Sequence, residues 1–221
     1  MTDDRWTPPS WRDEGPGSGQ HDIPLVAHPY SELQTREFWI ACCTEWHERG
    51  RTDAEILGAW KRLADPEERK FIVLWGDQPE YGWPEATVAM AMIDEGFTCW
   101  TGVQFFPRNG GIVGSERQAR VTAQALALFH DSGHRLPPDY YRRLNAKQEM
   151  RNPDLVCFNP KTREWRFIEC KHKDRIDPKQ LNALAFLHDL TGARVEVRRV
   201  VRPGGKVKKS VAGTGRYRLA P

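Results

Sequence analysis

The sequence predicts an α/β domain with a mixed central sheet flanked by helices, preceded by a helical N-terminal extension. Two short apolar runs, residues 155–158 and 164–168, are separated by an Asn-Pro turn signal, which indicates a pair of strands. Apolar residues at helical spacing then run from Pro178 to near Gly192, and residues 193–201 alternate between apolar and polar side chains. Strands interleaved with a helix are typical of the α/β class.

The first 80 residues are expected to contribute an arm and a helical region. Residues 1–28 are rich in Pro, Gly, Ser and Asp, which favours a disordered arm. In residues 29–80, capping-box patterns begin at Ser31 and Thr52, each ahead of a stripe of apolar residues. A third short helix is expected over residues 67–75, so this region is predicted to be a small helical unit.

Residues 81–201 are predicted to form the core of the fold. Pro84 occupies a favoured first helical position, and the helix that it begins is expected to stop at Gly96. Residues 97–106 then indicate a strand. The remaining expected parts are an insertion with two helices and a basic tail, over residues 107–151 (helices 115–129 and 138–150) and 202–221.

The composition is that of a globular protein, with 39% hydrophobic and 29% charged residues. No apolar run is long enough to span a membrane, and the first residues lack the pattern of a signal peptide. The five cysteines include no CxxC pair and are odd in number, which supports neither a disulfide framework nor a zinc site. We therefore expect an intracellular protein, cytoplasmic in a bacterium or phage host, with a nuclear location open for a eukaryotic or viral one.

Positive charge is concentrated in the last third of the chain. Residues 151–221 contain seventeen Lys and Arg against seven Asp and Glu, a balance of +10, whereas residues 1–150 have sixteen against twenty-three, a balance of −7. A polyanion such as nucleic acid would be attracted to the basic part. Ordinary solvated surface charge is the alternative explanation of the same pattern.

The basic part also contains a cluster of chemically active residues. In an extended strand Glu169 and Lys171 share a face, with Cys170 on the opposite one. If the two predicted strands pair, Asp154 at the start of the first lies near the end of the second. Two carboxylates and an ammonium then converge at one edge of the sheet. Such hard oxygen ligands suit Mg²⁺ or Mn²⁺, and a neighbouring lysine can orient an attacking water.

Pro153-Asp154 and Glu169-Cys170-Lys171 resemble the motif of the PD-(D/E)xK nuclease superfamily, and the expected order of helix and strands is that of its restriction-endonuclease-like fold. The segment after the motif is similar to the virus-type replication-repair (VRR-NUC) family, in which a glutamine near the start of the next helix belongs to the signature, as Gln180 does here. The chain departs from that family at Cys170 and at His172-Lys173, where small or glycine-containing residues are frequent.

The resemblance implies a nuclease that uses Mg²⁺, with Mn²⁺ as a substitute, to hydrolyse DNA phosphodiester bonds. It implies a role in replication, repair or recombination, or in a mobile element or virus. Asp154 and Glu169 would bind the metal together with the backbone carbonyl of Cys170, and Lys171 would hold the attacking water or stabilise phosphoryl charge.

Two further residues are candidates with competing explanations. Glu85 matches the glutamate that the first helix of the superfamily commonly presents to the metal, but a carboxylate is also favoured in the first turn of any helix. Gln180 is also the residue that a capping box requires. Lys173, Arg175 and Lys179 are expected to contact DNA phosphates.

Two other functions stay open at the level of sequence. A non-catalytic nucleic-acid-binding protein could use the same sheet and basic tail, and a restriction-type endonuclease would use the same site with sequence-specific readout. The sequence leaves DNA and RNA open as the substrate, and likewise duplex and branched forms. Whether cleavage is internal or terminal, and whether the protein is a homodimer, are equally undecided.

Overall fold

The computed structural model describes part of the chain, namely residues 21–31, 34–37, 39–40, 71–72, 82–106, 116–136, 151–207 and 217–220. Within these residues the helices are α3 (Trp83–Asp94), α4 (Glu116–Asp131) and α6 (Pro178–Thr191). The strands are β1 (His21–Pro29), β2 (Phe71–Ile72), β3 (Thr98–Thr101), β4 (Leu155–Asn159), β5 (Glu164–Lys171), β6 (Arg194–Val201) and β7 (Tyr217–Ala220).

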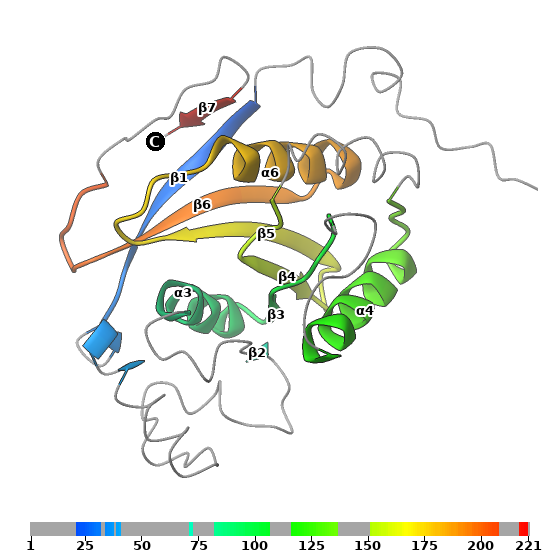
Figure 1. Cartoon of the computed structure of the whole chain (residues 1–221), viewed down its shortest axis with the longest axis horizontal. Helices are drawn as coiled ribbons and strands as arrows, with labels where there is room; N and C mark the ends of the chain where they lie inside the picture. The colour runs from blue at the N-terminus through cyan, green and yellow to red at the C-terminus, as the bar shows by residue number, and fades with distance from the viewer. Residues whose placement is uncertain are drawn as a thin grey trace, which may run out of the picture.

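The described strands form one mixed sheet in the order β2-β3-β4-β5-β6-β1-β7 (Figure 1). β4 is antiparallel to both of its neighbours, β3 and β5, whereas β5, β6, β1 and β7 are parallel to one another, as are β2 and β3. The parallel step from β5 to β6 is made by α6, as a crossover connection requires. The predicted fold class, an α/β fold with a mixed central sheet and flanking helices, is confirmed.

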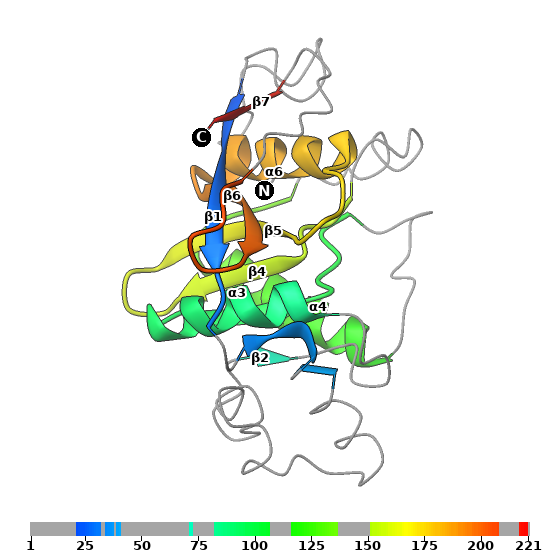
Figure 2. The ribbon, with the colours of Figure 1, turned by 90° about the vertical axis from the view of Figure 1, so that its left-hand side faces the viewer.

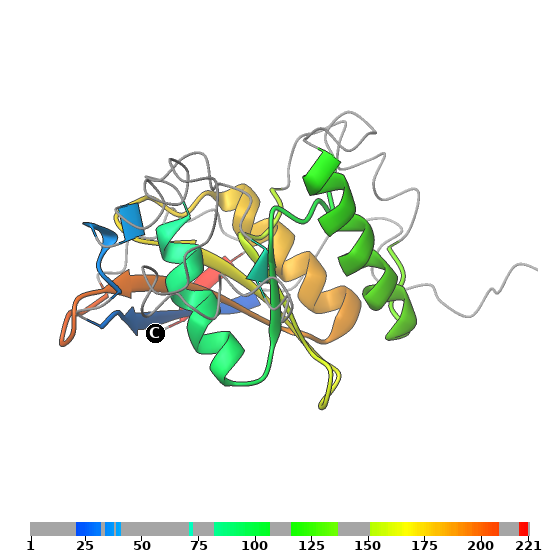
Figure 3. The same cartoon turned by 90° about the horizontal axis from the view of Figure 1, so that it is seen from below.

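Helices cover both faces of the sheet. β4 and β5 lie between α6 and α3 in Figure 2. Side chains of β4 alternate between two buried clusters: Leu155 and Cys157 pack with α3, whereas Val156 and Phe158 pack with α4 and α6. Figure 3 shows the ribbons of these three helices from below. A strand that alternates between two apolar layers is buried on both faces, which explains why residues 155–158 are apolar without interruption.

Local signals account for the ends of α6. The Asp177 side chain accepts a hydrogen bond from the backbone N–H of Lys179, and the Gln180 side chain accepts one from the backbone N–H of Asp177, so a complete capping box begins the helix. Gly192 ends it with a φ of 66°, a left-handed conformation that glycine adopts without steric cost. Both ends agree with the sequence prediction.

The prediction of a disordered arm is wrong for residues 21–28, because they belong to β1. Ile23 and Leu25 are buried in the cluster that packs with α4 and α6, and Leu25 pairs with Val197 of β6. The predicted basic tail likewise contains a strand, β7, which pairs with β1. Both strands exist through partners far away in sequence, so local composition did not indicate them.

Two expectations in the N-terminal half also need correction. The third short helix predicted over 67–75 contains β2 instead, and the strand predicted over 97–106 is limited to β3. Thr98–Thr101 is the part that pairs with β4, because each residue there has a partner between Leu155 and Phe158. The residues of the other predicted N-terminal helices lie largely, and those of the helix over 138–150 entirely, outside the described ranges.

The described helix of the predicted insertion over 107–151 packs into the core. This helix, α4, matches the helix expected over 115–129 and buries Val121, Ala125 and Phe129 in the same cluster as α6. Phe129 also lies edge-on to Trp165 of β5, with ring centroids 5.4 Å apart. α4 is therefore a structural part of the domain and covers one face of its sheet.

Candidate active site

Antiparallel pairing brings the start of β4 to the end of β5. The Leu155–Ile168 pair places Asp154, just before β4, beside the last residues of β5. One oxygen of the Asp154 carboxylate accepts a hydrogen bond from the backbone N–H of Cys170, at 2.9 Å. The structure therefore brings the aspartate of the motif to its Glu-Cys-Lys segment.

The side chains of the motif are divided between the two faces of the sheet. Cys170 packs in the cluster under α3, so Glu169 and Lys171 occupy the other face of the strand. The Lys171 ammonium pairs with the Glu169 carboxylate and lies 3.7 Å from that of Asp154. Exposure falls from 23% for the Asp154 side chain to 10% for Lys171 and 0% for Glu169, so the cluster extends from solvent into the interior.

Burial and mutual repulsion shape the charges of this cluster. Burial, followed by the charge of Asp154, raises the pKa of Glu169 well above its ordinary value, while the Lys171 ammonium opposes the shift. Burial lowers the pKa of Lys171, but the charges of Glu169 and Asp154 outweigh it, so the net shift is upward. One ammonium facing two carboxylates leaves an excess of negative charge, which a cation would offset.

Glu85 adds a third carboxyl group to the same electrostatic cluster. It lies in the first turn of α3, and burial together with the charge of Asp154 raises its pKa to about 8. Lys171 acts in the opposite direction. The Oε2 atom of Glu85 is buried and has no hydrogen-bond partner within the described part of the chain. A buried, unpartnered oxygen that is repelled by the charge of Asp154 is costly unless the group is protonated or a cation is close by.

This burial predicts a pH dependence of stability in the metal-free protein. Because the pKa of Glu85 is about 8 in the fold and 4.5 as its ordinary value, the folded state binds the extra proton, and stability falls as pH rises between these values. The Glu85→Gln variant lacks this loss. In EDTA, its free energy of unfolding relative to the wild type is expected to rise by up to about 3 kcal/mol between pH 5.5 and pH 8, measured by urea denaturation. An equal difference at both pH values would contradict the assignment.

The donor set fits a hard divalent cation. Within the described ranges, no three side chains of His, Cys, Asp and Glu converge on a common metal position. Mg²⁺ is usually held by one or two carboxylates, with waters and substrate phosphate completing its shell. Asp154 and Glu169 suit that pattern, because two carboxylates there share the single ammonium of Lys171.

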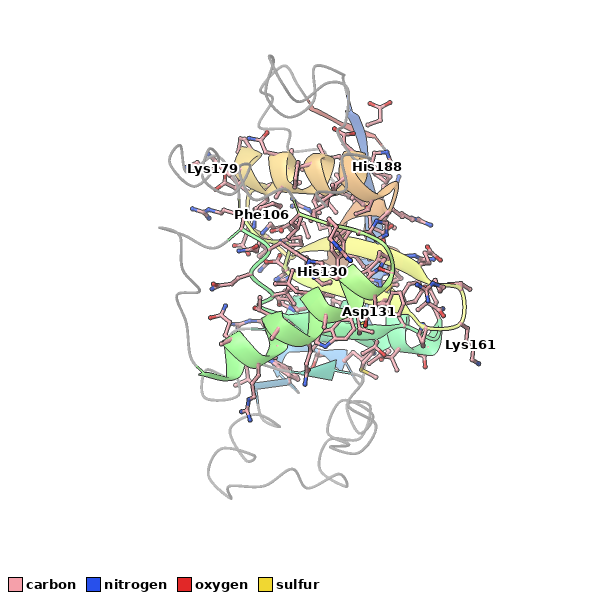
Figure 4. All side chains as sticks on the ribbon, turned by 90° about the vertical axis from the view of Figure 1, so that its right-hand side faces the viewer. Phe106, His130, Asp131, Lys161, Lys179 and His188 are labelled. Carbon is pink, nitrogen blue, oxygen red and sulfur yellow. The ribbon has the colours of Figure 1, made fainter. Side chains whose placement is uncertain are left out.

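The remaining residues expected at the site follow β5 along the chain. The side-chain oxygen of Gln180 accepts a hydrogen bond in the capping box at the start of α6, so this contact is structural. Lys173 and Arg175 are exposed in the segment that follows β5, and exposed Lys179 lies at the N-terminal end of α6 (Figure 4). All three are exposed to solvent, and Lys173 and Arg175 lie within four residues of Lys171.

Asn152 is a residue of the site region that the sequence did not indicate. Its Oδ1 accepts a hydrogen bond from the backbone N–H of Phe106 at 2.7 Å, and its Nδ2 donates to the carbonyl of the same residue at 3.3 Å. The Phe106 ring in turn packs edge-on against Phe186 of α6. This pair of hydrogen bonds anchors the chain two residues before Asp154. The sequence does not indicate this contact, because the partner of Asn152 is a backbone group that is far away along the chain.

His172, directly after the motif lysine, was likewise not singled out as a site residue. Its ring lies edge-on to Trp83, with centroids 5.0 Å apart, and Trp83 donates a hydrogen bond from Nε1 to the carbonyl of Gln34 at 2.8 Å. Burial lowers the pKa of His172, as does the charge of Lys173. The first turn of α3 and the segment near residue 34 are thus joined to the end of β5.

Comparison with known families agrees with this geometry. Residues 114–202 match the family model described as the VRR-NUC domain, which belongs to the PD-(D/E)xK type of nuclease domains. The match includes Asp154, Glu169 and Lys171, and it begins before α4, which supports the view that this helix is part of the domain. No curated protein matches the chain. Within the described residues, no helix is both long and apolar enough to cross a membrane.

Proposed function

We propose that the chain is a nuclease that hydrolyses DNA phosphodiester bonds with the help of Mg²⁺, because residues 114–202 match the family model of the VRR-NUC domain. The observation that supports this proposal best is the meeting of Asp154, Glu169 and Lys171 at one edge of the sheet. A surface salt bridge would not need a fully buried glutamate next to a second carboxylate.

Each residue has a chemical role in the proposal. Asp154 and Glu169, with the backbone carbonyl of Cys170, would hold the Mg²⁺ ion, and Glu85 would complete the site from α3. A bound Mg²⁺, or Mn²⁺ in its place, lowers the pKa of water and offsets charge on the phosphate. Lys171 stabilises the negative charge that develops on the phosphoryl oxygens, or orients the attacking water, from a position 3.7 Å from Asp154.

Three exposed basic residues bind the substrate in this proposal. Lys173, Arg175 and Lys179 contact DNA phosphates, which position the substrate without reading its sequence. Gln180 supports the site by fixing the first turn of α6. The substrate is duplex or branched DNA in replication, repair or recombination, or in a mobile element.

The test is a cleavage panel with the purified full-length chain. Linear, nicked, flapped and four-way DNA are incubated with Mg²⁺, with Mn²⁺ and with excess EDTA. We expect cleavage with either metal, none with EDTA, and recovery when Mg²⁺ is restored above the chelator. Cleavage that persists in EDTA would contradict the metal site.

A second outcome separates the alternative functions. Salt-sensitive binding of all four DNA forms with no cleavage under any metal would favour the non-catalytic nucleic-acid-binding protein over the nuclease. Cleavage confined to one short sequence in linear DNA would instead indicate a restriction-type enzyme. Cleavage of the same four DNA forms therefore distinguishes these two alternatives.

A further inference from the structure

Three parallel strands end at the edge of the sheet that holds the candidate active site. Lys171 of β5 pairs with Arg199 of β6, and Pro29 of β1 pairs with Val201 of β6. The backbone N–H of Tyr30 also donates to the carbonyl of Val201, at 3.1 Å. Because parallel strands leave a sheet on the same side, the segments that follow β5 and β6 start next to each other.

The segment after β6 is a tight turn with very little side chain. The backbone N–H of Gly205 donates to the carbonyl of Arg202 at 2.8 Å, Pro203 is the second residue of the turn, and Gly204 has a φ of 74°, as in a type II turn. A Cβ atom on Gly205 would lie 2.8 Å from the Arg202 carbonyl oxygen, so this position also requires glycine. We call this element the 202–206 turn.

Basic side chains lie at both ends of the 202–206 turn and in the segment next to it. Arg202 begins the 202–206 turn and Lys206 ends it, and both are exposed. Lys173 and Arg175, in the neighbouring segment after β5, are exposed too. Over residues 172–176 and 202–207 the sole acidic residue is Asp174, so these two segments have four Lys and Arg against one Asp. These two segments beyond Lys171 therefore carry a net positive charge.

The rise per residue of a β-strand gives the distance between Lys171 and the start of the 202–206 turn. Arg202 lies three residues beyond Arg199, the partner of Lys171, which corresponds to about 10 Å along the strand direction. Duplex DNA advances about 3.4 Å per base pair, so about 10 Å corresponds to roughly three base pairs. A strand of DNA with one phosphate at Lys171 can therefore reach Arg202 with a phosphate a few nucleotides away.

We propose that the 202–206 turn is a second phosphate-binding element, which holds the DNA backbone about three nucleotides from the bond that is cut. The glycines let a phosphate approach the main chain closely, and Arg202 and Lys206 supply charge on either side of it. This inference rests on the proposed nuclease function and adds the direction in which the substrate leaves the site, along β6 and past its C-terminal end.

The test compares two double variants of the full-length chain that remove equal charge. Arg202→Ala with Lys206→Ala alters the 202–206 turn. Lys161→Ala with Arg163→Ala alters the turn between β4 and β5, at the other end of those strands, where Figure 4 shows Lys161. Binding to a 30-base-pair duplex is measured in EDTA between 50 and 200 mM salt, and Tm confirms the fold of both variants.

We expect the first variant to bind about tenfold or more weakly at low salt, and the slope of log K against log salt to become shallower by about 1.8, or 0.9 for each lost phosphate contact. The second variant should keep the wild-type slope. Gly205→Ala, which keeps both charges but displaces the turn, should also weaken binding. Equal slopes for the wild type and both double variants would overturn the proposal.

The same experiment separates this inference from the proposed function. If the wild type binds DNA with the expected slopes but never cleaves it with Mg²⁺ or Mn²⁺, the 202–206 turn stands as a binding element and the nuclease proposal fails. If the wild type cleaves DNA and the two double variants bind and cleave alike, the nuclease stands and the role of the turn is refuted.

Discussion

Changing Asp154 to asparagine is expected to lower the rate of DNA cleavage about a thousandfold. The substitution removes one of the two carboxylates that would hold the metal, and such charge stabilisation contributes several kcal/mol to the transition state, with each factor of ten in rate equal to about 1.4 kcal/mol. Asparagine keeps the volume of the side chain and an oxygen that can still accept the hydrogen bond from the Cys170 backbone N–H. The fold should therefore be preserved.

The measurement is single-turnover cleavage of labelled DNA at saturating protein, over a range of Mg²⁺ concentrations. Asp131→Asn is the control, because Asp131 is an exposed acid at the C-terminal end of α4 (Figure 4). Its carbonyl accepts a hydrogen bond from Arg163 in the turn between β4 and β5, at the opposite end of those strands from the motif. The control variant should cleave at the wild-type rate. Unchanged cleavage by Asp154→Asn would remove this residue from the reaction.

Changing Lys171 to methionine is expected to lower cleavage by about a hundredfold to a thousandfold, as the loss of one donor that stabilises transition-state charge does in other enzymes. It also leaves the Glu169 carboxylate buried without its ammonium partner. Removing one member of a buried ion pair typically costs about 3–5 kcal/mol. We therefore expect a lower Tm at pH 8 in the metal-free variant as well as the slower reaction.

The double variant Lys171→Met with Glu169→Gln separates these two effects. Replacing both members of the pair removes the uncompensated charge, so Tm should return towards the wild-type value. Cleavage should stay as low as in the single variant or lower. If activity recovers together with Tm, Lys171 acts only on stability, and the catalytic assignment is wrong. Lys161→Met, at an exposed position in the turn between β4 and β5, controls for loss of a lysine.

The elements that were predicted correctly depend on signals within a few residues. α6 begins with a capping box at Asp177 and ends at Gly192, and both ends can be predicted from the residue types at these positions. The Asn-Pro turn joins β4 to β5, and a hairpin brings residues close in sequence into contact. For that reason the meeting of Asp154 with Glu169 and Lys171 could be predicted from the sequence.

The elements that were missed depend on partners far away in the chain. β1 forms because it lies between β6 and β7, and nothing near Pro24 marks it as a strand. The helix α4 was itself predicted, but its packing into the core against residues such as Trp165 of β5 was not, nor was the anchoring of Asn152 to the backbone of Phe106. None of these pairings has a spacing or composition that a reader of the sequence can recognise.

The sequence by itself therefore determined the hairpin that carries the motif, the helix after it and the excess of positive charge in the last third of the chain. The tertiary structure decided which strands complete the sheet, how deeply Glu169 and Glu85 are buried, and that the 202–206 turn begins beside the strand that ends at Lys171. The physical reason is range: caps, turns and alternation act over a few residues, whereas burial and parallel strand pairing arise only when distant segments pack together.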